Sequence, residues 1–97
     1  MSELVIAHEE ADGKGAFFVT RDGTRLGEMR YHRDRDDHVV IVHTEVSDVL
    51  RGQGVARKLL DATVAWARET GTKLGATCPY AKAQFDKDAA IRDVYLT

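Results

Sequence analysis

The sequence is poor in the residues and segments that mark secreted and membrane-spanning proteins. Its 97 residues include a single cysteine, Cys78, which excludes an internal disulfide and is typical of a protein kept in a reducing compartment. No apolar run approaches the roughly 20 residues that a helix needs to cross a bilayer. The acidic residues Glu3, Glu9 and Glu10 in the first segment argue against a signal peptide. We therefore expect a cytoplasmic protein.

An excess of one charge is also missing. The chain has 14 Lys and Arg residues against 16 Asp and Glu residues, which gives a net charge of −2. No basic field favours nucleic acid, so we expect neither nucleic acid nor a membrane as a partner. A content of 43% hydrophobic and 31% charged residues is typical of a globular protein. This length suits one hydrophobic core, and no linker or repeat divides the chain. We expect a single domain over residues 1–97, as a monomer or weak dimer.

The first half of the chain predicts four strands. Residues 3–9, 16–20 and 25–32 carry strand-forming residues and are separated by Asp-Gly turns, which tolerate positive φ. Residues 38–46 contain four consecutive β-branched residues and so have apolar side chains on both faces. Such a strand is typical of the centre of a sheet.

The second half predicts a helix, a strand and a short helical end. Residues 53–70 place apolar side chains on one helical stripe, and Gly71 is suited to end the helix. Residues 73–78 then predict a fifth strand, which should lie parallel to the fourth because a crossover helix joins them. Residues 80–87 predict a second helix and residues 91–96 a short turn. The predicted fold class is α+β.

The turn between the central strand and the long helix, Arg-Gly-Gln-Gly-Val-Ala over residues 51–56, is the most informative stretch. A glycine-bearing turn at a helix start leaves N–H groups unpaired at the positive end of the helix dipole, which favours an anion such as phosphate. Gly52 and Gly54 let a ligand approach the backbone, and Arg51 can add a charged hydrogen bond. The spacing differs from P-loop and Rossmann glycine motifs. The alternative is a helix start with a solvated arginine.

This turn is similar to the pyrophosphate-binding signature of the GNAT superfamily of acyltransferases, [QR]-x-x-G-x-[GA]. Arg51, Gly54 and Ala56 fill the signature positions. Together with His-Thr-Glu-Val at 43–46 and Cys-Pro-Tyr at 78–80, the turn resembles a small GNAT-like family of about this length. The resemblance implies a truncated GNAT acyl-CoA N-acyltransferase fold that lacks the leading helices and closing hairpin with which larger members bind the acceptor.

The resemblance further implies acetyl-CoA or coenzyme A as cosubstrate and no metal. Backbone amides from Gln53 to Arg57 would hold the pyrophosphate, with Arg51 and Arg57 supplying charge. The fourth and fifth strands of GNAT folds splay apart, and residues 44–47 would contact the pantetheine arm through their backbone. The expected binding residues are Thr44, Val46, Arg51, Gly52, Gln53, Gly54, Val55, Ala56 and Arg57.

Four side chains are candidates for a catalytic role. Cys78 would lie near the sulfur of the ligand, and the cysteine of this family is proposed to be acylated; otherwise it is a small buried hydrophobe. His43 and Glu45 lie two apart on a strand and share a face, so either could act as general base for an amine or for Cys78, or they form a polar pair. Tyr80 could be a general acid or a packing residue. The other histidines have no metal-ligand spacing with Cys78.

Two functions remain open. The first is an acetyl-CoA-dependent acetyltransferase that acts on an unidentified amine or thiol, on a small molecule or a protein, and that can work through an acyl-cysteine. The second is a CoA-binding module without turnover. The presence of His43, Glu45 and Cys78 favours the first, and the missing acceptor-binding elements favour the second. A third interpretation, an interaction domain that kept only the fold, requires residues 51–56 to bind nothing.

Overall fold

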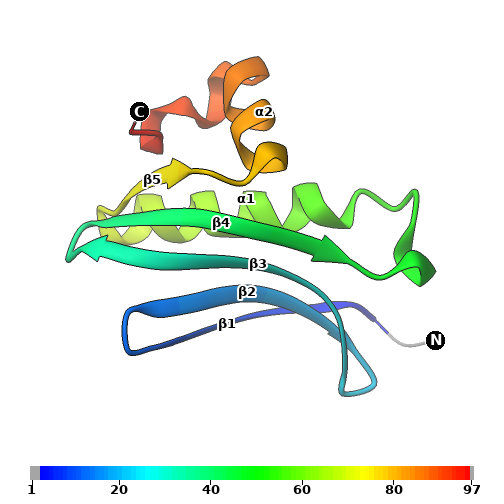
Figure 1. Ribbon diagram of the computed structural model, residues 1–97. Helices are drawn as coiled ribbons and strands as arrows, with labels where there is room; N and C mark the ends of the chain where they lie inside the picture. Colours follow the sequence, from blue (N-terminus) through cyan, green and yellow to red (C-terminus); the bar gives the residue numbers. More distant parts are fainter. Residues whose placement is uncertain (1–2, 97) are drawn as a thin grey trace.

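The computed structural model describes residues 3–96, in which one five-stranded sheet is packed against helices (Figure 1). The strands lie side by side in chain order, antiparallel from β1 to β4 and parallel between β4 and β5. The elements are β1 (Val5–Ala11), β2 (Lys14–Arg21), β3 (Thr24–Arg35), β4 (His38–Val46), the 3-10 helix η1 (Asp48–Leu50), α1 (Val55–Thr70), β5 (Lys73–Ala76), α2 (Pro79–Lys87) and the 3-10 helix η2 (Ala89–Val94). The predicted order of elements and the α+β class are confirmed.

Two Asp-Gly turns explain how β1, β2 and β3 pair. Asp12 and Gly13 have φ of 55° and 77°, and Asp22 and Gly23 have φ of 52° and 80°. Positive φ at both central residues produces a turn whose twist matches the flanking strands, and Asp-Gly is well suited to it. The Asp-Gly pairs therefore fix β1 on β2 and β2 on β3, as the sequence predicts.

The parallel pair is short, and its end creates the feature on which the site depends. His38 to Ile41 of β4 pair with Lys73 to Ala76 of β5. The N–H groups of Thr77 and Cys78 still reach the Ile41 carbonyl, at 3.0 and 3.1 Å. Beyond Ile41, β4 continues while the chain after β5 turns into α2. We call this divergence, between residues 42–46 and residues 77–80, the β4–β5 fork.

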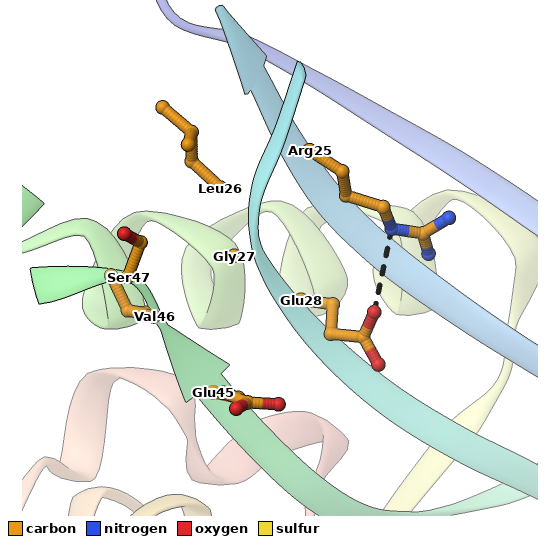
Figure 2. Close-up of a pocket in the computed structure, with 7 residues that line it drawn as sticks. All are labelled: Arg25, Leu26, Gly27, Glu28, Glu45, Val46 and Ser47. Atoms are coloured by element: carbon orange, nitrogen blue, oxygen red, sulfur yellow. Dashed lines mark ion pairs between the residues drawn. The ribbon is translucent and has the colours of Figure 1, made fainter. Parts of the chain in front are cut away.

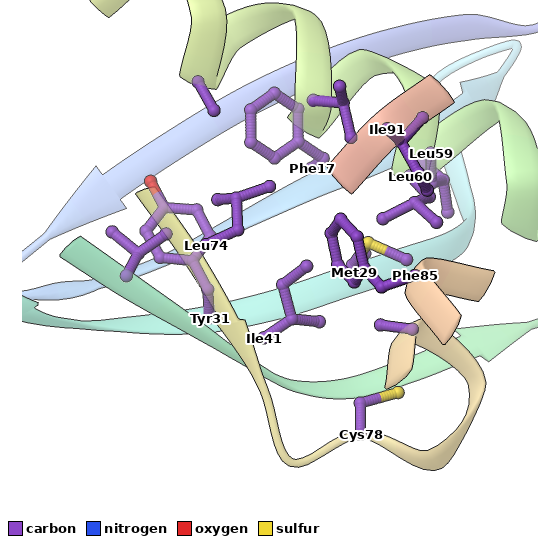
Figure 3. Close-up of a cluster of buried hydrophobic side chains, with 14 of the residues drawn as sticks. Phe17, Met29, Tyr31, Ile41, Leu59, Leu60, Leu74, Cys78, Phe85 and Ile91 are labelled. Atoms are coloured by element: carbon purple, nitrogen blue, oxygen red, sulfur yellow. The ribbon is translucent and has the colours of Figure 1, made fainter. Parts of the chain in front are cut away.

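One face of the sheet carries the hydrophobic core (Figure 3). Side chains from the sheet, from α1 and from the C-terminal helices meet there, and all are buried: Phe17, Met29, Tyr31, Ile41, Leu59, Leu60, Leu74, Phe85 and Ile91. The opposite face carries charged side chains such as Glu28, Arg30 and Glu45, and no helix of the described chain covers them. The helices therefore lie on one side of the sheet only.

Boundaries near the fork differ from the sequence prediction. β5 ends at Ala76 rather than at residue 78, and Cys78 is the N-cap of α2. α2 begins at Pro79, because proline lacks an N–H group and its fixed φ suits the first helical position. α1 begins at Val55 after a left-handed Gly54, two residues later than predicted. The final segment forms η2, whereas a turn was predicted for residues 91–96.

Candidate functional site

The start of α1 presents a row of unpaired backbone donors. Gly52 and Gly54 have φ of 81° and 67°, and a side chain added at either would meet no atom within 4 Å, so the space above the loop is open. Lys58 donates to the Gly54 carbonyl at 3.1 Å, which is the first bond of the helix. Within residues 3–96, the N–H groups of residues 54–57 have no hydrogen-bond acceptor. Four donors at the positive end of a 16-residue helix form an environment suited to an anion.

These donors border a cavity of about 340 Å³ that extends from the end of β4 to the start of α2. The loop supplies most of its wall. The lining residues are Val46, Ser47, Asp48, Leu50, Arg51, Gly52, Gly54, Val55, Ala56, Arg57 and Tyr80. The cavity thus brings together most of the binding residues predicted from the sequence; Gln53 and Thr44 are not among those that line it.

A second cavity, of about 270 Å³, lies beside the first and shares Val46 and Ser47 with it (Figure 2). Its wall includes Arg25 and Glu28, whose Nε and Oε1 atoms are 3.4 Å apart. Sequence reasoning missed this pair, because only the β3–β4 register places it beside Val46. The end of β4 therefore lies between two cavities.

The two predicted arginines are already paired with carboxylates. Arg51 donates to Asp48 Oδ1 at 3.0 Å, and both side chains are largely exposed. Arg57 donates to Asp61 at 2.9 Å, to Gln84 at 2.8 Å and also to Asp88. The hydrogen bond with Asp88, followed by that with Asp61, raises the pKa of Arg57. The exposed pair of Arg51 is weak and exchangeable, so Arg51 stays available to an anion beside the backbone N–H groups, whereas Arg57 is held by its partners on α1 and near α2.

A β-bulge decides which residues of β4 face the core. Tyr31 pairs with Ile41, but Arg30 pairs with His43, so Val42 is an extra residue without a partner. The following residue on the core side is Thr44, opposite the fully buried Met29. Bulges commonly redirect side chains beside active sites. Here the bulge turns Thr44 inward.

Thr44 meets Cys78 across the fork. Thr44 Oγ1 is 3.2 Å from Cys78 Sγ, which is the hydrogen-bond partner of the sulfur among the described residues. Cys78 is only 3% exposed and lies at the edge of the hydrophobic core (Figure 3). The thiol is thus buried, and it lies beside the part of β4 that was predicted to contact the pantetheine arm.

His43 and Glu45 lie on the other face of β4. His43 Nε2 is 3.6 Å from Glu45 Oε2, and both side chains are exposed. The structure therefore does not bring His43 to Cys78, which was one predicted role of the imidazole. Both groups face the side of the sheet without helices, where an acceptor can approach.

Tyr80 connects the cavity to the fork. Its phenol is partly buried, and this burial raises the pKa of Tyr80 above its ordinary value. The hydroxyl consequently remains protonated at neutral pH and available as a donor. Its position on the cavity wall agrees with the predicted general-acid role without excluding packing.

Clusters of metal ligands and membrane-spanning helices are both absent from residues 3–96. No three His, Cys, Asp or Glu side chains in the described part of the chain lie close enough together to hold a metal ion. The helices formed by residues 3–96 do not include one with the length and apolarity required to span a bilayer.

The chain is similar to known proteins in sequence and in structure. Residues 16–94 match the family described as GCN5-related N-acetyl-transferase. A GCN5-like protein from Staphylococcus aureus is 38% identical, with 99% of this chain and 91% of that chain covered and a TM-score of 0.73. No curated protein matches the chain.

Two more distant structures share the fold. The aminoglycoside N-acetyltransferase AAC(6')-Iy, solved with CoA, is 16% identical over 94% of this chain and 88% of that chain, with a TM-score of 0.62. The ribosomal-protein-S18-alanine N-acetyltransferase of Escherichia coli is 17% identical over 79% of this chain and 52% of that chain, with a TM-score of 0.65. These matches confirm the GNAT fold, and with the match over residues 16–94 they show that the chain belongs to the GCN5-related N-acetyl-transferase family.

Proposed function

We propose that this protein is an acetyl-CoA-dependent acetyltransferase with an amine or thiol acceptor, built as one domain over residues 1–97. The observation that carries the proposal is the row of four unpaired N–H groups of residues 54–57 beside a cavity at the fork. Membership of the family and the CoA bound to a structural neighbour support the same ligand. The acceptor is a small molecule or a protein surface, and the expected state is a monomer or weak dimer.

The residues present fit a CoA thioester, which would supply the activated acetyl group. The amides of residues 54–57 hold the pyrophosphate, and the left-handed Gly52 and Gly54 leave room for it. Arg51 exchanges Asp48 for a phosphate oxygen. Thr44 and Val46 contact the pantetheine arm through the backbone on the β5 side of β4, where the strand pairing of the described residues ends at Ile41.

Two routes of transfer are consistent with the side chains. In the direct route, an amine attacks the thioester carbonyl from the open face of the sheet and His43 or Glu45 accepts a proton from it, while an amide bond forms and the bond to the CoA sulfur breaks to release CoA. In the second route, the sulfur of Cys78 attacks the carbonyl, a new thioester bond forms on Cys78, and the bond to the CoA sulfur breaks. The proton of the Cys78 thiol then ends on the released CoA thiol, so the numbers of thioesters and thiols are unchanged.

Binding is tested with a pair of matched variants. Gly54→Glu places bulk and negative charge at the proposed phosphate site and should abolish CoA binding measured by calorimetry. Gly71→Glu is the control, since Gly71 has the same left-handed backbone, with φ of 70°, and the same open surroundings at the other end of α1. It should lose similar stability but bind CoA normally. Unchanged affinity in folded Gly54→Glu would contradict the proposed site.

Transfer is tested by incubating the protein with acetyl-CoA and measuring its intact mass. One acetyl group on wild type, absent from Cys78→Ala and removed by hydroxylamine, would support the cysteine route. Full turnover of an amine by Cys78→Ala would support direct transfer with His43 or Glu45 as base. CoA binding with neither adduct nor turnover would favour the binding module without catalysis.

A further inference from the structure

We propose that Thr44 is a positioning residue for the sulfur of Cys78, which it holds at the β4–β5 fork through a hydrogen bond from its hydroxyl. This inference rests on the proposed cysteine route and adds a residue whose side chain has no assigned role. It starts from the 3.2 Å distance between Thr44 Oγ1 and Cys78 Sγ. The two residues are 34 positions apart in sequence, so the contact depends entirely on the fold.

The bulge makes the contact possible. In a regular strand, side chains alternate, so Ile41 and Thr44 would point to opposite faces. The extra residue Val42 places both on the core side, where Ile41 is fully buried and Thr44 faces the fork. The main chain fixes the other partner, because the Cys78 N–H donates to the Ile41 carbonyl at 3.1 Å. Both ends of the contact are therefore held by backbone structure.

The chemistry of the two groups sets the direction of the bond. A hydroxyl is a good donor, whereas a thiol is a weak donor and sulfur a weak acceptor. Within residues 3–96, Cys78 Sγ is the hydrogen-bond partner of the Thr44 hydroxyl. When the sulfur carries negative charge during attack, only the hydroxyl can donate, and the bond strengthens because one partner is ionised. Thr44 thus orients the sulfur and stabilises the charge that develops on it.

The chain allows a clean test because Cys78 is its single cysteine. Thr44→Val keeps the shape of threonine but removes the hydroxyl, and Thr44→Ser keeps the hydroxyl. We would measure, by intact mass, the rate of acetylation by acetyl-CoA and the rate of alkylation by iodoacetamide. Thr44→Val should slow both by about tenfold, which is the effect of losing one hydrogen bond to a charged atom. Thr44→Ser should restore most of each rate.

Two further measurements separate positioning from packing. Affinity for CoA and the denaturation midpoint should be nearly equal in the two variants, because both keep the backbone of β4. Wild-type rates in Thr44→Val, or equally slow rates in Thr44→Ser, would overturn the proposal. If wild type forms no acetyl adduct, the cysteine route fails by itself. Alkylation then still decides about Thr44, because it does not require CoA: an unchanged rate in Thr44→Val overturns its role and a slower rate supports it.

Discussion

Glu10, on the edge strand β1, forms hydrogen bonds with side chains at the edge of the core. Its carboxylate accepts hydrogen bonds from the Tyr31 hydroxyl at 2.7 Å and from the Arg33 guanidinium at 2.8 Å. The Tyr31 oxygen is also 2.6 Å from His8 Nε2, and the His8 ring stacks on Phe17. The hydrogen bond from Arg33, followed by that from Tyr31, lowers the pKa of Glu10 to about 2. A buried phenol is thereby given a charged partner.

Lowering the pH should weaken the hydrogen bonds of Glu10 and so reduce the stability of the fold. The pKa of Glu10 falls from an ordinary value of 4.5 to about 2 on folding, so its stabilising effect is complete above pH 4.5 and is lost as the pH falls toward 2. Glu10→Gln should therefore lower the free energy of unfolding at pH 7 and flatten its decrease between these pH values. Urea denaturation across the range measures both effects, with Glu9→Gln as control. Parallel pH curves for wild type and Glu10→Gln would show that the carboxylate contributes nothing.

At the scale of elements, α1 connects the core to the anion-binding loop. Its buried residues include Leu59 and Leu60, which the 3.6-residue periodicity predicts, and also Val64. Trp66, on the same predicted stripe, is only partly buried and packs at the edge of the core. Packing of the stripe fixes the axis of α1, so the same contacts orient the N–H groups at its start.

Shortening Leu59 should weaken this connection. The side chain is fully buried between the sheet and α1, so Leu59→Ala leaves a cavity and should cost about 2–5 kcal/mol of unfolding free energy. Glu69→Ala, at an exposed position of the same helix, should change stability by only about 0.5 kcal/mol. Chemical denaturation measures both. A midpoint for Leu59→Ala close to that of wild type would show that the site is not tightly packed.

Short sequence patterns predict the strands and helices, whereas the pairing of the strands determines which side chains reach the site. Asp-Gly turns, the apolar stripe of α1 and the glycines of residues 51–56 are contained in a few consecutive residues, so the sequence predicts them. The bulge at Val42 has no comparable local signal, because it appears only in the register of β4 against β3. From the sequence, His43 or Glu45 is a candidate base for Cys78 or for an amine, whereas the structure places Thr44 beside Cys78.

At the scale of the whole molecule, the candidate site lies where three elements converge: the end of β4, the start of α1 and the start of α2. Arg57 links two of them, since it reaches from the first turn of α1 to Gln84 and Asp88. These partners lie 27 and 31 positions away, and the sequence instead predicts Arg57 as a source of charge for the phosphates. The loop could be predicted from the sequence, but the arrangement around it depends on tertiary contacts.

Ligand binding should consequently stabilise the entire fold. A ligand that binds only the folded state at about 100 times its Kd adds about 2.7 kcal/mol to the unfolding free energy. We expect CoA to raise the denaturation midpoint of wild type and of Gly71→Glu, but not that of Gly54→Glu. Thermal or urea denaturation with and without CoA makes the comparison. A midpoint of wild type that is insensitive to saturating CoA would contradict binding at the convergence of these elements.

The extra residue Val42 changes which residues of β4 face the helices. Before it, the odd-numbered Val39 and Ile41 face the helices; after it, the even-numbered Thr44 and Val46 do. If β4 instead paired regularly through this point, with Val42 opposite Arg30 and His43 opposite Met29, the imidazole and the carboxylate of residues 43 and 45 would face the fork and the Thr44 hydroxyl would point outward. The register of β4 against β3 thus decides whether acid–base groups or a hydroxyl lie beside the sulfur.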